Sequence, residues 1–164
     1  MAKTDLTAQC LRELLHYEPE TGMFTRLHDA RRWKAGQLVG SINQCIGYTY
    51  VTVAGYTDTA HRLAWLYMTG EWPAGVIDHI DGIRDNNRWS NLRDVPQSIN
   101  LQNRKRAQTD NKVGFLGVSM RRGRYRATIV THRKQTHLGD FDTPEQAHAA
   151  YLDAKRLLHA GNTL

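Results

Sequence analysis

Val76-Ile77-Asp78-His79-Ile80-Asp81-Gly82 is an apolar segment that runs into a carboxylate, an imidazole and a glycine turn. A polar loop follows it, with Asn91 twelve residues after His79 and Asn100 twenty-one residues after it. We expect a strand before the glycine turn and a second short strand from Leu92 to Val95. A helix opening after this second strand would carry Asn100, because a proline stands at its first position.

These residue types suit metal-assisted hydrolysis of a phosphodiester. Asp78 beside His79 can place a divalent cation next to a general base, and Asn100 can supply a second oxygen ligand. An imidazole with an ordinary pKa of about 6.5 can accept a proton from water near neutral pH. The cation would polarise the phosphate and stabilise the departing oxygen as a Lewis acid. The pattern therefore predicts a metal-dependent enzyme that acts on phosphodiesters.

Each of these residues also has a structural interpretation. An isolated Asp-His pair is most often a hydrogen-bonded pair within a fold, and the surrounding glycine turn and Asn-rich loop are what favour catalysis. Asn91 could be a turn or capping residue, and Asp81 is expected to order the loop rather than bind metal. His61, at the start of an expected helix, is interpreted as a hydrogen-bonded packing residue, and Arg62 as a candidate phosphate contact.

Residues 45 to 106 carry a set of short motifs. They are Ala60-His61-Arg62-Leu63-Ala64-Trp65, Asp78-His79-Ile80-Asp81-Gly82, Asn86-Asn87-Arg88, Ser90-Asn91-Leu92 and Asn100-x-x-Asn103-Arg104. This set resembles the HNH endonuclease family, in the branch found in phage and intron-borne homing enzymes. The resemblance implies a ββα-metal (His-Me finger) fold for the nuclease core.

The HNH resemblance also implies a role for each site residue. His79 would be the general base, and Asp78 and Asn100 would be the metal ligands. Asn91, counted with the catalytic residues, would tie the intervening loop to the strand that carries the base. Because the last ligand position holds Asn rather than His, a hard ion such as Mg²⁺ or Mn²⁺ is favoured over zinc, with one ion in each active site.

The charge of the chain points to a polyanionic partner. The 164 residues carry a formal net charge of +6, and the sequence pI is about 9.5. The excess lies in residues 111–164, which hold nine Lys and Arg against four Asp and Glu. Such an uneven basic distribution is typical of proteins that bind nucleic acid.

The cysteines and the N-terminal sequence bear on the compartment. Cys10 and Cys45 are far apart, so the sequence suggests neither a zinc knuckle nor a disulfide framework. The N-terminus lacks an apolar signal core, and no uncharged apolar run reaches membrane-spanning length. We therefore expect a soluble protein in the cytoplasm of a bacterial host, encoded by a phage or mobile element.

The sequence patterns divide the chain into four parts and predict an α+β fold. Within the first part, Thr7 to His16 is expected to be a helix and Phe24 to Ala60 to contain strands. A further helix is expected from His61 to Met68. The four parts are a β-rich N-terminal segment at residues 1–60, the ββα-metal nuclease core at 61–106, a basic linker at 107–113 and a DNA-binding domain at 114–164.

The last part predicts a three-stranded antiparallel sheet packed on one helix. Gly114 to Ile129 contains two strand patterns around a glycine turn, and Thr136 to Phe141 contains a third. Thr143 is a good N-cap for the following helix, which Gly161 would close. Alanines in the apolar stripe of this helix would let it lie close to the sheet.

This C-terminal part resembles the Apetala and ethylene-response-factor DNA-binding domain over residues 112 to 161. The resemblance rests on Leu116-Gly117-Val118, Arg124-Tyr125-Arg126-Ala127, Leu138-Gly139-Asp140-Phe141-Asp142-Thr143-Pro144-Glu145-Gln146-Ala147 and Ala150-Tyr151. It implies a sheet that lies in the major groove of double-stranded DNA. The candidate DNA contacts are Arg121, Arg122, Arg124 and Arg126. Because successive residues of a strand point to opposite faces, some of these arginines could instead form a solvated basic surface.

Arg104 and Lys105, directly after the expected catalytic helix, are further candidates for contact with the DNA backbone. Together these features lead us to expect a homing-type DNA endonuclease that nicks double-stranded DNA as a monomer and has no membrane partner. A non-catalytic DNA-binding regulatory or architectural protein is the main alternative. An RNA-directed nuclease is a third possibility, which a sheet suited to a duplex groove disfavours.

Overall fold

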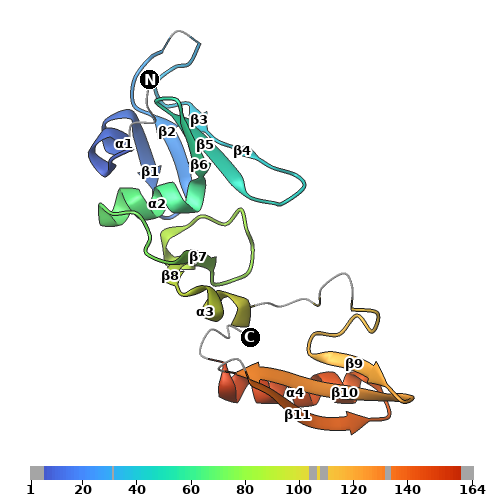
Figure 1. The fold of residues 1–164 in the computed structure, drawn as a ribbon. Coiled ribbons are helices and arrows are strands. Elements are labelled where there is room, and N and C mark those ends of the chain that lie inside the picture. The colour runs from blue at the N-terminus through green and yellow to red at the C-terminus, as the bar shows by residue number, and fades with distance from the viewer. Residues whose placement is uncertain (1–5, 31, 104–106, 108–110, 132–133, 160–164) are drawn as a thin grey trace. The chain divides into compact units, whose positions relative to one another are not determined.

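The computed structural model describes residues 6–30, 32–103, 107, 111–131 and 134–159. The chain divides into two compact units, Met1–Gln97 and Ser98–Leu164. Small antiparallel sheets and helices make up each unit, so the fold is a mixture of α and β structure (Figure 1). None of the helices in the described ranges is long and apolar enough to span a membrane.

The first unit begins with a helix that is shorter than predicted. Helix α1 covers Ala8–Leu14, and Thr7 caps it by accepting a hydrogen bond from the backbone N–H of Cys10. Strand β1 follows at once as Leu15–Glu18, so the prediction of helix through His16 was wrong. Leu15 and Tyr17 are buried while their neighbours are exposed, which is the alternation of a strand. The apolar spacing of Leu11, Leu14 and Leu15 concealed this change of period.

Two three-stranded sheets form most of the first unit. Strand β1 pairs with β2 (Met23–Arg26), which pairs with β3 (Leu38–Val39). Strand β4 (Ser41–Ile42) pairs with β5 (Thr49–Val53), which pairs with β6 (Tyr56–Thr59). The β5–β6 hairpin is the one expected from the sequence, with Gly55 at a φ of 78° in its turn.

Helix α2 (Ala60–Thr69) follows β6 directly. Its buried residues include Leu63 and Leu66, which share a face because they are three positions apart. The helix ends at Gly70, whose φ of 89° lies in the left-handed region that glycine adopts without strain. This end agrees with the one expected from the sequence.

The predicted strand, loop, strand and helix order is present. Strand β7 is Val76–His79 and strand β8 is Leu92–Val95, and the two pair in antiparallel register. A short 3₁₀ helix, η1 (Trp89–Asn91), leads into β8. Helix α3 follows as Gln97–Gln102.

One apolar core joins residues on either side of the boundary expected at residue 60. The cluster draws on both N-terminal sheets, on α1 and α2, and on β7 and β8. Residue 60 therefore does not separate two cores, while the division of the chain into functional parts stays a prediction. The least exposed members of the cluster are Leu11, Leu15, Tyr17, Phe24, Val51, Ala60, Leu63, Ala64 and Leu66.

The second unit contains the expected three-stranded sheet and helix. Strands β9 (Val118–Arg121), β10 (Arg124–Thr131) and β11 (Lys134–Phe141) pair antiparallel in the order β11-β10-β9. Helix α4 (Pro144–Leu158) begins after its N-cap Thr143. Gly161, the expected closing residue, lies outside the described residues.

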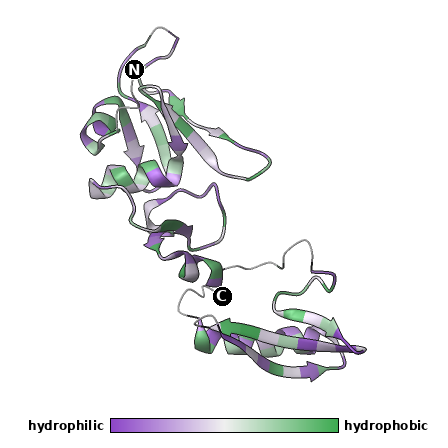
Figure 2. Ribbon diagram, viewed as in Figure 1, coloured by the Kyte–Doolittle hydropathy of each residue, from purple (hydrophilic) through white to green (hydrophobic). Residues whose placement is uncertain are grey.

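A small apolar core forms between this sheet and α4. Val118, Ala127 and Ala147 are its buried members. Strand β10 is hydrophilic where it begins beside the β9–β10 turn and hydrophobic toward its end (Figure 2). The alanine on α4 allows the close approach that the sequence predicted.

Candidate active site

Asp78 and His79 end strand β7, where it runs into the loop. Both side chains are buried, each residue being 5% exposed. Antiparallel pairing places Arg93 opposite Asp78 and Leu92 opposite His79. The rigid β7–β8 pair thus fixes the backbone of both residues, and the side-chain contacts decide what each can do.

The imidazole of His79 is oriented by Asn87. Nε2 of His79 lies 3.2 Å from Oδ1 of Asn87. The Asn87 amide nitrogen donates to the carbonyl of Asp85 at 3.1 Å, which directs its oxygen toward His79. Since that oxygen can only accept, Nε2 carries the proton and Nδ1 is the basic nitrogen.

His79 is neutral near pH 7. Burial lowers its pKa from the ordinary value, because the charged form loses hydration. The hydrogen bond with Asn87 and the charges of Asp81, Asp78 and Asp85 act in the opposite direction without reversing the shift. A neutral imidazole can accept a proton, which is the first requirement for a general base.

Asn91 binds the loop to the end of β7. Its amide oxygen accepts from the Asp81 N–H at 2.9 Å, and its nitrogen donates to an Asp81 carboxylate oxygen at 3.0 Å and to the Asn86 carbonyl at 2.8 Å. The backbone N–H of Ile80 also donates to the Asn91 carbonyl at 2.9 Å. These bonds close the loop on the residue that follows His79.

The Asp81 carboxylate is engaged inside the same loop. It accepts from the backbone N–H of Ile83 at 2.8 Å and from the side chain of Asn86 at 2.6 Å. Burial raises the pKa of Asp81, but these bonds and the one from Asn91 outweigh it and lower the pKa overall. Asp81 thus makes the loop-ordering contacts expected of it from the sequence.

Arg93 makes a contact with Asp78 that sequence analysis missed. Its Nε and one terminal nitrogen donate to the same oxygen, Oδ2 of Asp78, at 2.9 and 2.7 Å. The two residues face each other across β7 and β8, so the strand register brings the pair together. A cationic side chain therefore already contacts the carboxylate expected to bind metal.

The donor chemistry of this region fits a hard divalent cation. The described residues contain no group of three His, Cys, Asp or Glu side chains that could form a protein-only cage. The Asp78 carboxylate is the ligand type that Mg²⁺ prefers, and Mg²⁺ usually keeps most of its shell for water and phosphate. Asn100 lies on α3 in the second unit, so its role as the second ligand stays a prediction.

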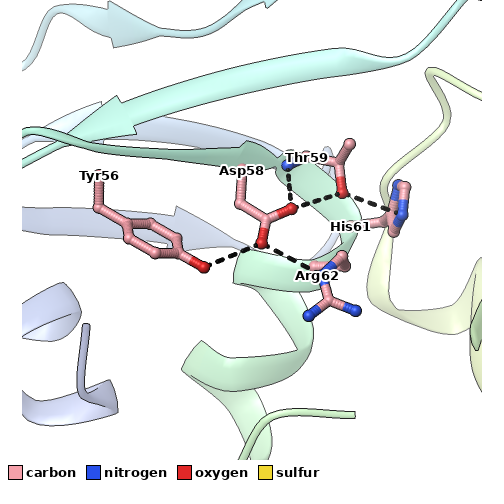
Figure 3. Close-up of polar contacts among 5 residues, drawn as sticks. All are labelled: Tyr56, Asp58, Thr59, His61 and Arg62. Carbon is pink, nitrogen blue, oxygen red and sulfur yellow. Dashed lines mark hydrogen bonds and ion pairs between the residues drawn. The ribbon is translucent and has the colours of Figure 1, made fainter. Parts of the chain in front are cut away.

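His61, at the start of α2, lies against the ring of His79. The two ring centroids are 5.0 Å apart and the ring planes are nearly perpendicular, at 86°. His61 is 8% exposed, and its Nε2 lies 3.1 Å from the hydroxyl oxygen of Thr59 (Figure 3). Burial lowers its pKa to about 3; the neighbouring His79 and Arg62 act in the same direction and Asp58 opposes them. The sequence predicted a packing residue but not this neighbour.

Arg62 points to Asp58 within the first unit. Its Nε donates to Oδ2 of Asp58 at 3.2 Å (Figure 3). Its guanidinium also lies over the ring of Trp72, 5.3 Å from the centroid. These contacts leave the side chain partly exposed, so a phosphate contact by Arg62 stays a prediction.

The β1–β2 hairpin supports the loop that carries Asn87. The Tyr17 hydroxyl donates to the Asn87 carbonyl at 2.6 Å, and the Trp89 N–H donates to the Pro19 carbonyl at 3.0 Å. A Cβ at Gly22 would lie 2.3 Å from the carbonyl carbon of Asn87, so only glycine allows this approach. The β1–β2 hairpin thus holds the residue that orients His79.

The region around β7 and β8 also has relatives among known proteins. Residues 58–102 match the model of the HNH endonuclease family. This segment contains Asp78, His79, Asn87, Asn91 and Asn100. Below we refer to it as the HNH segment.

A DNA endonuclease, I-HmuI of Bacillus phage SP01, is 41% identical to the chain over 58 residues. The aligned region is 35% of this chain and 33% of that protein, so the chain spans about a third of the length of its relative. No solved structure gives a significant match to the chain. Nucleases of the HNH family generally use a divalent metal ion.

Outside the HNH segment, the second unit carries the predicted DNA contacts. Arg121 and Arg124 are cross-strand partners and Arg126 lies two residues further on, so all three occupy one face of the sheet. Arg122 stands in the β9–β10 turn with a φ of 51°. Arg104 and Lys105 lie outside the described residues.

Two of these arginines are paired with acidic residues. Arg126 donates to both carboxylate oxygens of Asp140, at 2.8 and 3.0 Å, and this pair lowers the pKa of Asp140 to about 2. Arg124 lies 3.0 Å from Asp142. A shallow depression of about 330 Å³ opens on the same face, lined mainly by Ser119, Arg121, Arg126, Thr128, Gln135 and His137.

Proposed function

We propose that this chain is a homing-type DNA endonuclease that hydrolyses phosphodiester bonds with a divalent metal ion. One observation carries the proposal: within the HNH segment, a neutral and buried His79 stands beside Asp78 with its Nε2 fixed by Asn87. The DNA endonuclease activity named for the phage relative supports the substrate class. Its phage source supports an origin in a phage or mobile element.

In the proposed reaction, Nδ1 of His79 takes a proton from the attacking water. Asn87 accepts the proton of Nε2, so Nδ1 is the nitrogen proposed to act as the base. The bonds of Asn91 and Asp81 hold the loop beside the base, so the ring need not reorganise during the reaction. Asp78 and Asn100 are proposed to hold one Mg²⁺ or Mn²⁺ ion, which when bound supplies Lewis-acid stabilisation of the leaving oxygen. One such site per monomer would cut one strand.

We further propose that the second unit holds the DNA duplex. Arg121, Arg124 and Arg126 lie on one open face of its sheet, together with polar side chains that can donate hydrogen bonds. Binding there would raise the local concentration of phosphodiester at the HNH segment.

A non-catalytic DNA-binding protein is the second candidate, and Arg93 favours it. Its guanidinium balances the charge of Asp78 through two hydrogen bonds, so the buried carboxylate is stable without a metal ion. In that case the HNH segment would only support the fold. The endonuclease is favoured because these residues lie in the HNH segment and the similar phage protein is named as a DNA endonuclease.

Incubation of supercoiled plasmid with the protein separates the two candidates. The endonuclease should convert plasmid to open circles with Mg²⁺ or Mn²⁺ and stop when a chelator is added. Retention of DNA on a gel without cleavage, across both metals, would favour the non-catalytic candidate. Binding is measured in the same reactions, so loss of folding is detected as loss of both signals.

A further inference from the structure

Asp58 anchors a network of polar contacts that extends to His61, the neighbour of His79. Its Oδ1 accepts from the backbone N–H of Thr59 at 2.7 Å and from the Thr59 hydroxyl at 3.3 Å (Figure 3). Its Oδ2 accepts from the Tyr56 hydroxyl and from Nε of Arg62, each at 3.2 Å. The Thr59 oxygen then lies 3.1 Å from Nε2 of His61. These residues all come from β6 and the first turn of α2.

This network of contacts selects one tautomer of His61. A carboxylate can only accept, so the single hydroxyl proton of Thr59 is directed to Asp58. The Thr59 oxygen must then accept from His61, which places the His61 proton on Nε2. The lone pair of His61 is therefore on Nδ1.

Nδ1 of His61 is buried and has no hydrogen-bond partner among the described residues. Burying an acceptor without a donor costs free energy, and an apolar ring at this position would avoid the cost. Packing alone therefore does not explain why an imidazole stands here. The feature that distinguishes this position is its neighbour, because the His61 ring meets the His79 ring at 5.0 Å and 86°.

The ring of Tyr48 also packs beside His79. The centroid of Tyr48 lies 6.0 Å from that of His79 and 5.2 Å from that of His61. Asn87 contacts His79 at Nε2. Rings packed against the imidazole add to this restraint, because the last side-chain torsion of histidine is broad when unrestrained.

We propose that His61 is a positioning residue for His79. The network of contacts from Asp58 through Thr59 fixes His61 in one tautomer and one orientation. His61 acts on the base through ring contact and takes no part in bond making. Only the expected effect of His61 on DNA cleavage rests on the proposed function. The orientation of the His79 ring is a property of the folded protein and can be measured separately.

Thr59→Val tests the contact network, because valine keeps the shape of threonine and removes the hydroxyl oxygen that links Asp58 to His61. Thr59 makes no side-chain cap bond to α2, so the start of the helix is retained. We expect single-turnover nicking at saturating DNA to fall about tenfold, the lower range for removing a residue that orients an active-site ligand, with DNA affinity unchanged. Thr59→Ser restores the hydroxyl and should restore the rate. His61→Ala, which removes the ring itself, should cost about a hundredfold.

Thr57→Val on the same strand is the matched control. The Thr57 hydroxyl contacts the Thr52 hydroxyl at 2.8 Å on the exposed side of the β5–β6 hairpin. It is not part of the contact network that reaches His61. Thr57→Val should leave the rate of nicking unchanged. Wild-type rates in both folded Thr59→Val and His61→Ala would overturn the proposal, and if His61→Ala does not fold, the Thr59→Val and Thr59→Ser pair decides alone.

Nitrogen NMR of the His79 ring gives a readout that does not require cleavage. The wild-type ring should show a single tautomer with the proton on Nε2, and Thr59→Val should shift or broaden its signals while Thr57→Val does not. Unchanged His79 signals in Thr59→Val would contradict the proposal whether or not the protein cuts DNA. A wild-type protein that never nicks, yet shows these NMR changes, would contradict only the proposed function.

Discussion

The Tyr17 hydroxyl donates a hydrogen bond of 2.6 Å to the backbone carbonyl of Asn87, seventy positions further along the chain. The side chain of Asn87 in turn meets Nε2 of His79. A residue of the first hairpin thus contacts the residue that orients the proposed base. This relationship connects the N-terminal hairpin to the proposed active site through Asn87.

Tyr17→Phe should lower both stability and cleavage. It removes the donor and leaves a buried carbonyl unsatisfied, so we expect a loss of roughly 1 to 3 kcal/mol in the free energy of unfolding. Urea unfolding measures the first effect, and single-turnover nicking at saturating DNA measures the second. Tyr50→Phe on β5 is the control, because the Tyr50 hydroxyl makes no hydrogen bond within the described part of the chain. Equal rates and stabilities in both variants would contradict this role of the hairpin.

Gly22→Ala should be more damaging than an ordinary glycine substitution. Gly22 has a φ of 75°, and an added Cβ would also meet the Asn87 carbonyl carbon at 2.3 Å and the Arg88 nitrogen at 2.5 Å. Backbone atoms cannot yield as a flexible side chain does, so the loss of stability should exceed about 1 kcal/mol. Gly36→Ala separates the two effects, because Gly36 has a φ of 79° but nothing lies within 4 Å of its added Cβ. Thermal or urea unfolding of the two variants should therefore rank Gly22→Ala as the less stable.

Local sequence patterns were enough to predict the β7 and β8 strands, the β5–β6 hairpin and the C-terminal sheet with its helix. Period-two alternation, a turn glycine and a threonine cap are written in neighbouring residues, so they can be recognised without knowledge of the fold. The β1 strand was missed because Leu11, Leu14 and Leu15 continue a helical spacing into a residue that begins a strand.

The contacts around His79 could not be predicted in the same way. Asn87 was visible as part of an Asn-rich motif, but nothing in its neighbours indicated that its side chain would turn toward His79. Arg93 meets Asp78 through strand register, and His61 meets His79 through the packing of α2. Such pairings depend on tertiary arrangement, which single-sequence periodicity does not encode.

The buried His61 should make stability depend on pH. Its folded pKa of about 3 lies below the ordinary value of 6.5, so the unfolded chain binds the proton more tightly. Stability should therefore fall as the pH drops from 6.5 toward 3, by up to about 1.4 kcal/mol per pH unit from this group. His79, Asp58 and Arg62 are the titratable or charged groups that influence it, and all three remain in His61→Gln.

The measurement is the free energy of unfolding at several pH values between 4 and 7 for the wild type and His61→Gln. The variant should lose less stability on acidification than the wild type. His16→Gln, at a half-exposed position, is the control for replacing an imidazole elsewhere in the chain. Identical slopes in the wild type and His61→Gln would show that His61 does not stay neutral in the folded protein.

Arg121→Gln should weaken DNA binding in a salt-dependent manner. Arg121 lies on the open face of the C-terminal sheet and makes no ion pair among the described residues, unlike Arg126. Loss of one phosphate contact should reduce the slope of log affinity against log salt by about one. Arg156→Gln on α4 removes the same charge and should leave the slope unchanged. The rate of nicking at saturating DNA should be similar in both variants, and equal slopes would remove the sheet face from the DNA interface.

His79→Ala in a single-turnover nicking reaction with Mg²⁺ and saturating plasmid is the most direct measurement of whether His79 is the base. His16→Ala serves as the control for loss of an imidazole. We predict that His79→Ala keeps its DNA affinity and loses at least about a hundredfold in rate, the scale expected for removal of a general base. A folded His79→Ala that nicks at the wild-type rate would contradict the assignment of His79.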